Sequence, residues 1–105
     1  MKAEDERLRK SRFWRKFLRL TRGRVTVLRA LRVIAEEEEE SSFRKTIESV
    51  RAAVERGATL SEALAGFGAE FCPSVVELVR TAEKTGAWDE ILVEIAEGLE
   101  EGTFA

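Results

Sequence analysis

The sequence contains no histidine and no tyrosine, and it has a single cysteine and a single proline. Without histidine, the commonest general base of enzymes is missing, and zinc sites that combine cysteine with histidine are excluded. One cysteine cannot form a disulfide within the chain. No run of apolar residues approaches the ~20 that a transmembrane helix requires. A metal site built from carboxylates alone, or a role without catalysis, stays open.

The chain has 105 residues, of which 44% are hydrophobic and 36% are charged. This length fits one compact domain, and the apolar share is sufficient for a core. We expect residues 1–11 to be a flexible polar tail, residues 12–102 to be a single helical domain and residues 103–105 to be a second tail. The lone Cys72 follows Phe71, and we expect it to be a small buried apolar residue.

Charge is distributed very unevenly along the chain. Residues 1–34 hold twelve Lys or Arg against three acidic residues, a net charge of +9. Residues 35–105 hold six against seventeen, a net charge of −11, so that the whole chain carries −2. A bipolar chain of this kind is typical of proteins that associate with themselves or bind partners of opposite sign. The split therefore favours a homodimer or two oppositely charged partners.

Apolar residues recur at helical spacing in about six segments, and no segment alternates with the period of a strand. The clearest stripe is formed by Phe43, Ile47, Val50 and Val54. The pattern predicts an all-α fold, a compact bundle of about six short antiparallel helices. The predicted helix ends are an N-cap at Ser41 or Ser42, a capping box of Thr59 and Glu62, Pro73 in a first turn, and terminal glycines at Gly57, Gly86 and Gly102.

Two ordered motifs resemble the F domain of type II secretion systems, which belongs to the inner-membrane platform protein shared by type II secretion and type IV pilus machines. The first is Val50–Leu64, in which a helix ends in glycine and Thr-Leu-Ser-Glu-Ala-Leu follows. The second is Ala82–Leu92, which is similar to the family's Gly-Glu-x-Ser/Thr-Gly-x-Leu-x-x-x-Leu. Phe71 and Pro73 fall where the family has a Phe-Pro pair. The resemblance extends from Phe13 to Leu99.

The chain departs from the family pattern in local turns. The family has Gly-Val-Pro where this chain has Arg24-Val25-Thr26, with its glycine one position earlier at Gly23. Ala82 replaces a glycine, Cys72 separates the Phe from the Pro, and Trp88 stands at a leucine position. Full members of the family carry two such domains and several membrane helices. The sequence is consistent with either an excised cytoplasmic domain or a stand-alone relative.

The resemblance implies a non-catalytic scaffold or adaptor at the cytoplasmic face of the bacterial inner membrane, in contact with the assembly ATPase and other platform proteins. It implies no cofactor, no metal and no enzymatic activity, and membrane contact only through segments absent from this chain or through peripheral contact. The alternative is a small helical nucleic-acid-binding protein that uses the basic N-terminal third, with Trp14 as a stacking residue. No helix-turn-helix or other nucleic-acid signature supports this alternative.

The first group of candidate interaction residues surrounds one predicted tight turn and consists of Glu83, Lys84, Gly86, Asp89 and Glu90. It is either a surface recognition corner or half of a carboxylate site for Ca²⁺, which takes six to eight oxygen ligands. The simpler interpretation is structural. A glycine ends one helix, an aspartate complements the dipole of the next, and the glutamate accepts hydrogen bonds from turn amides.

The second group is basic and consists of Arg15, Arg19, Arg29 and Arg32, which share their segment with Lys16, Arg22 and Arg24. These side chains are candidates for anionic lipid head groups, for an acidic face of another protein or for nucleic acid, and their plain alternative is a solvated helix face. The acidic run Glu36–Glu40 lies at a predicted helix end, where the dipole disfavours it. It either frays there or faces a basic patch, which the chain's own first two helices offer.

Overall fold

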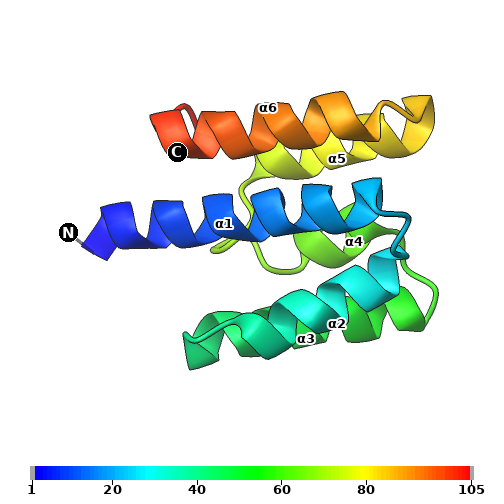
Figure 1. Ribbon diagram of the computed structural model, residues 1–105, viewed down its shortest axis with the longest axis horizontal. Helices are drawn as coiled ribbons and strands as arrows, with labels where there is room; N and C mark the ends of the chain where they lie inside the picture. The colour runs from blue at the N-terminus through cyan, green and yellow to red at the C-terminus, as the bar shows by residue number, and fades with distance from the viewer. Residues whose placement is uncertain (1, 105) are drawn as a thin grey trace.

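Six helices make up the part of the chain that the computed structural model describes, residues 2–104, with side chains from residue 5 onward (Figure 1). No strand occurs within these residues, so the prediction of an all-α bundle of about six helices is confirmed. Loops between the helices are short. The helices are α1 (Lys2–Arg22), α2 (Val27–Glu37), α3 (Ser41–Glu55), α4 (Leu60–Ala65), α5 (Pro73–Thr85) and α6 (Trp88–Glu101).

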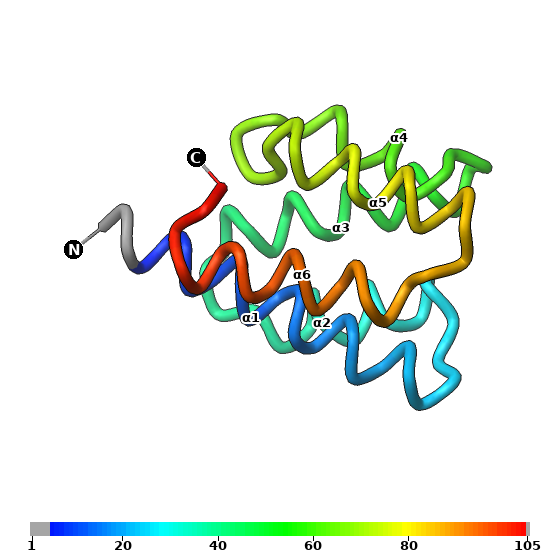
Figure 2. Tube along the Cα trace, turned by 90° about the horizontal axis from the view of Figure 1, so that it is seen from above, coloured from blue at the N-terminus to red at the C-terminus, as the bar shows by residue number. Residues whose placement is uncertain are grey.

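The helices form a closed ring of contacts. Each helix packs on the next one along the chain, and α6 completes the ring by packing on α1. Figure 1 shows α1 between two antiparallel pairs, α2 with α3 on one side and α5 with α6 on the other. The view from above places α6 alongside α1 and antiparallel to it (Figure 2). The first helix is therefore the element that joins the two pairs.

Helix α1 is longer than predicted, because residues 2–11 are helical where we expected a flexible polar tail. Ser11 is buried, and its hydroxyl donates to Glu100 of α6 at 3.0 Å. The ammonium group of Lys10 donates to the carbonyl oxygen of Ala69 at 3.3 Å. These partners lie far away in the sequence, so local polarity alone does not reveal them. Met1 and Ala105, the outermost residues of the two expected tails, lie outside the described residues.

An aromatic cluster centred on α1 forms the middle of the core. The ring of Phe13 lies 5.0 Å from that of Trp14, 5.9 Å from that of Phe43 and 5.6 Å from that of Phe71, measured between centroids. Phe43 comes from α3 and Phe71 from the loop before α5. All four are at most 3% exposed. Edge-to-face and tilted aromatic pairs of this kind add to the free energy of area burial, so the cluster fixes α1 against both halves.

Most predicted helix ends are confirmed. The hydroxyl of Thr59 accepts from the amide of Glu62, whose carboxylate accepts from the amide of Thr59, which is the predicted capping box. Gly57, Gly86 and Gly102 each have a positive φ after the helix that they end, and Pro73 occupies the first turn of α5.

The N-cap of α3 differs from the prediction. Glu40, not Ser41 or Ser42, is the N-cap, and its carboxylate accepts from the amides of Ser42 and Phe43 at 2.9 Å each. A glutamate is long enough to fold back over the first turn, and its negative charge is favoured there by the helix dipole.

Gly98 lies inside α6, where the ring of Phe104 approaches the helix backbone closely. A glycine within a helix is destabilising by about 1 kcal/mol relative to alanine. A β-carbon at position 98 would overlap the ring of Phe104, which folds back onto the helix. The amide of Thr103 donates to the carbonyl oxygen of Gly98 at 2.7 Å and holds this return. The residues expected as a second tail are thus packed against the bundle as far as Phe104.

The turn after α1 places a residue other than glycine in the left-handed region. The amide of Val25 donates to the carbonyl of Leu20, and the amide of Arg24 donates to that of Thr21, which is the Schellman pattern of a helix C-terminus. Arg24 has φ 66° at the position where glycine is usual, whereas Gly23 does not have a positive φ. The resembling family has its glycine at the position of Arg24, so this departure introduces backbone strain.

We predict that Arg24→Gly stabilises the chain by about 0.5–1 kcal/mol, because the left-handed conformation is unfavourable by about 1–2 kcal/mol for a residue with a β-carbon and glycine loses only part of this gain to chain entropy. Urea unfolding followed by circular dichroism measures the change. Arg24→Ala is the matched control, since it removes the same charge but keeps the strain, and it is expected to give no gain. Equal stabilisation by both variants would contradict this account.

Candidate functional site

The corner between α5 and α6 contains one residue that the fold itself uses, Glu83. Its carboxylate accepts from the amide of Ser61 at 2.9 Å and from the Ser61 hydroxyl at 2.6 Å. Ser61 is 2% exposed and lies in the first turn of α4, where helix amides lack partners within the helix. Glu83 therefore completes the N-terminus of α4, and it bonds to another helix instead of the amides of its own turn.

The other residues of this corner are directed to solvent. Asp89 forms an ion pair with Arg22 of α1 at 3.5 Å, and both side chains are more than half exposed, so the pair contributes little to stability. Lys84, Gly86 and Glu90 are exposed. The two carboxylates suggested for Ca²⁺ thus bond to different elements, Asp89 to α1 and Glu83 to α4. Within the described residues, no three acidic or cysteine side chains gather in a way that would hold a metal ion.

Part of the positive charge of α1 is paired inside the molecule. Its basic side chains meet acidic ones from the end of α2 and from α6. The pairs are Arg9 with Glu38 at 3.8 Å, Arg15 with Glu100 at 2.9 Å, Lys16 with Glu37 at 3.2 Å and Arg22 with Asp89 at 3.5 Å. The two oppositely charged parts of the sequence therefore partly neutralise each other within one chain.

The ion pair of Arg15 and Glu100 has the best geometry among these. The guanidinium donates from Nε to Oε2 at 3.0 Å and from Nη2 to Oε1 at 2.9 Å, and the Ser11 hydroxyl also donates to Oε2. These hydrogen bonds hold the pKa of Glu100 below its ordinary value, and the hydrogen bond from Arg15 has the largest effect. The hydrogen bond to Glu100 likewise raises the pKa of Arg15. Arg15, one of the interaction candidates, is thus engaged in joining α1 to α6.

The acidic run Glu36–Glu40 connects α2 to α3 instead of hanging at a frayed end. Glu37 and Glu38 face basic side chains of α1, as the hypothesis of an internal basic patch required. Glu40 caps α3, and its hydrogen bonds from the amides of Ser42 and Phe43 lower its pKa. The helix dipole therefore disfavours Glu36 and Glu37 in the last turn of α2 but favours Glu40 at the start of α3.

Three of the basic candidates remain free at the surface. Arg19, Arg29 and Arg32 are exposed, and none of them forms an ion pair with any side chain among residues 5–104. Two further expectations need correction. Trp14 is 1% exposed, so the ring that was to stack on nucleic-acid bases is buried in the core. Cys72 is only partly buried, because it lines a surface pocket.

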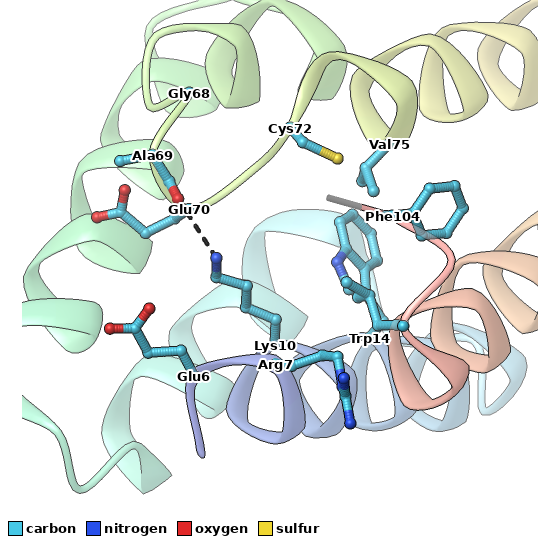
Figure 3. Close-up of a pocket in the computed structure, with 12 residues that line it drawn as sticks. Glu6, Arg7, Lys10, Trp14, Gly68, Ala69, Glu70, Cys72, Val75 and Phe104 are labelled. Carbon is cyan, nitrogen blue, oxygen red and sulfur yellow. Dashed lines mark hydrogen bonds between the residues drawn. The ribbon is translucent and has the colours of Figure 1, made fainter. Parts of the chain in front are cut away.

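That pocket has a volume of about 340 Å³ and lies between the first half of α1, the loop before α5 and the end of α6 (Figure 3). Trp14, Val75 and Phe104 form its apolar side, and the thiol of Cys72 is directed toward them (Figure 3). Lys10 lies on the polar side, where its ammonium group is bonded to a backbone carbonyl. Sequence reasoning missed this pocket, because Phe104 was assigned to a tail.

Fold and surface together define a small helical packing module whose accessible chemistry lies in charged outer faces. The family model described as type II secretion system (T2SS), protein F, matches residues 13–103. The chain therefore belongs to the type II secretion system protein F family, and the resemblance noted in the sequence is confirmed. No curated protein matches the chain. Among the described residues, no helix combines the length and the apolar character needed to cross a membrane.

We predict that Glu83→Ala lowers the free energy of unfolding by about 2 kcal/mol, the usual effect of losing hydrogen bonds to a charged group. The loss should be smaller in a Ser61→Ala background, where one of the two bonds is already gone. Lys84→Ala is the neighbouring exposed control, expected within about 0.5 kcal/mol of the parent chain. Chemical denaturation of the four variants measures these values. Unchanged stability of the Glu83→Ala chain would contradict this structural role and would favour a role of the carboxylate in binding a partner.

We also predict that Glu100 contributes to the free energy of unfolding at neutral pH and that this contribution is lost in acid. Because its pKa is lowered on folding, its contribution to stability is present above the unfolded value of about 4.3 and is lost as the pH falls through the lower folded value. The exposed pair is worth less than about 1 kcal/mol. Unfolding at pH 7 and pH 3 should show a smaller loss of stability for Glu100→Gln than for the parent chain. Glu94→Gln, exposed on the same helix, should retain the full loss.

Proposed function

We propose that the chain is a non-catalytic adaptor domain of an inner-membrane platform in a type II secretion or type IV pilus machine. The family match over residues 13–103 is the observation that carries this proposal. The surface supports it, because it presents many exposed charged side chains that are suited to contacts with partner proteins. The 340 Å³ pocket is lined by the charged residues Glu6, Arg7, Lys10 and Glu70 and by Cys72, and it contains no histidine, since the chain has none.

The partner-binding surface that we propose is the corner between α5 and α6. Lys84 and Glu90 are exposed on either side of Gly86, and neither forms an ion pair among the described side chains. Two residues fix the backbone of this corner. Glu83 accepts a hydrogen bond from α4, and Gly86 forms the turn with a positive φ. Two opposite charges on a rigid turn give directional recognition, because electrostatic complementarity chiefly determines specificity.

In this proposal the domain works at the cytoplasmic face of the inner membrane and contacts the assembly ATPase and other platform proteins. Self-association into a homodimer is part of the proposal. It would draw on the charges that internal pairing leaves free, such as Arg19 on α1 and Glu94 on α6. Contacts between exposed charges weaken as salt screens them, so sedimentation equilibrium at low and at near-molar salt separates a charge-driven dimer from a monomer.

We predict that exchanging the two charges of the corner, Lys84→Glu with Glu90→Lys, weakens binding to the cognate assembly ATPase at least tenfold, since like charges then meet across the contact. Surface plasmon resonance with the purified ATPase measures the dissociation constant. The double variant keeps the net charge of the chain, so a loss of binding reports the position of the charges.

The matched control exchanges two exposed charges of α3, Lys45→Glu with Glu48→Lys. It is expected to bind within about twofold of the parent chain, as rim charges away from the contact contribute little. Equal weakening in both double variants would remove the corner from the interface. Complete lack of binding by the parent chain would contradict the proposed ATPase contact.

A further inference from the structure

The outward face of α2 combines free guanidinium groups with half-exposed aliphatic side chains. Leu28, Arg29, Arg32 and Val33 line one open hollow of about 480 Å³, together with Thr26 and Glu36. Arg29 and Arg32 are exposed, while Leu28 and Val33 are partly buried. The opposite side of the helix is formed by buried Ala30, Leu31, Ile34 and Ala35. The helix thus has a core side and a distinct outer side of mixed character.

The charges on this face are not used by the fold. The basic residues Arg9, Arg15 and Lys16 of α1 all have acidic partners within the chain. Arg29 and Arg32 form no ion pair with any described side chain. The acidic residue of the hollow, Glu36, lies a turn beyond Arg32 toward the C-terminal end of the helix. The face is therefore basic at the N-terminal end of α2.

Two further arginines precede this face along the chain. Arg24 lies in the turn just before α2, Arg19 lies in the last turn of α1, and both are exposed. Helix α1 packs against α2, so the end of one helix and the start of the other are close. All of these groups are arginines, whose planar guanidinium binds phosphate oxygens in pairs, whereas lysine acts as a point charge.

We propose that this outer face of α2, with the turn before it, rests on the phosphate head groups of an anionic bilayer. The arginines bind the phosphates, and Leu28 and Val33 enter the boundary between head groups and acyl chains, as in helices that lie in a membrane interface. Leu28 and Val33 flank the two arginines on the outer side of the helix, and this combination of guanidinium and aliphatic groups fits a surface that offers both phosphates and acyl chains. This contact is separate from the proposed partner corner at α5 and α6.

The test is co-sedimentation of the 105-residue chain with vesicles of phosphatidylcholine that contain about one-third phosphatidylglycerol, at about 0.15 M salt. Each arginine near such a surface contributes about fivefold to the binding constant. Arg29→Gln with Arg32→Gln should therefore weaken binding about 25-fold. Unchanged circular dichroism and melting temperature confirm that both exposed substitutions leave the fold intact.

The matched control is Lys45→Gln with Arg56→Gln, which removes two exposed positive charges, one on α3 and one at the residue that caps its C-terminal end. It should weaken binding no more than about threefold, because only the overall charge changes. Equal losses in the two double variants would overturn the proposal in favour of attraction by net charge. Equal binding to vesicles of pure phosphatidylcholine, or no binding to the anionic vesicles, would overturn it as well.

Soluble polyglutamate provides a further arm, since it offers carboxylates without a bilayer. Binding of the parent chain to polyglutamate, lost in Arg29→Gln with Arg32→Gln and accompanied by no vesicle binding, would assign the face to an acidic protein and overturn the lipid proposal. Vesicle binding that polyglutamate does not displace supports it. The ATPase measurement uses other residues, so the two proposals can fail independently.

Discussion

Burial of the aromatic side of α1 is the interaction on which the rest of the structure depends. Phe13 contacts Phe43 of α3, and Phe13 and Trp14 both contact Phe71 in the loop before α5, so one helix is shared by both antiparallel pairs. A chain of this size has room for a single core. Removing these rings would leave two small helical layers without enough apolar area to pack on each other. The ring of helix contacts, closed by α6 on α1, follows from this arrangement.

The oppositely charged parts of the sequence lie side by side in the folded molecule, where some of their charges form ion pairs. Along the chain they separate cleanly at about residue 34, but the closed ring brings α1 next to α6 and next to the end of α2. Arg15 and Glu100 lie 85 positions apart and still form a two-pronged ion pair. In the folded molecule some of the opposite charges pair internally, and the unpaired exposed charges are the ones available to partners.

The fold could be predicted from the sequence wherever a local rule acts. Gly57 and Gly86 ended helices as expected, and the Thr59 capping box formed, because each depends on residues within one turn. The predictions failed where distant partners decide. The first half of α1 bonds to distant segments, Ser11 to Glu100 and Lys10 to Ala69, and no local pattern contains these contacts.

The position of the candidate residues around one turn was predictable from the sequence, but the partners to which they bond were not. The sequence placed Glu83 and Asp89 around one turn, and the structure shows them bonded to two different helices. Arg15 and Arg29 have the same chemistry in the sequence, yet only one of them has a partner within the chain. Whether a charged side chain forms an ion pair within the chain depends on how the helices pack, so the sequence alone does not reveal it.

The five consecutive glutamates, Glu36–Glu40, make different contacts although they are chemically identical. Glu37 and Glu38 hold α1, and Glu40 closes the start of α3, although the letters are identical. Loss of one glutamate from this stretch would leave its composition nearly unchanged but would force a choice between the grip on α1 and the closure of α3. The contact that each glutamate makes is therefore decided by its distance from the end of α2 and from the start of α3.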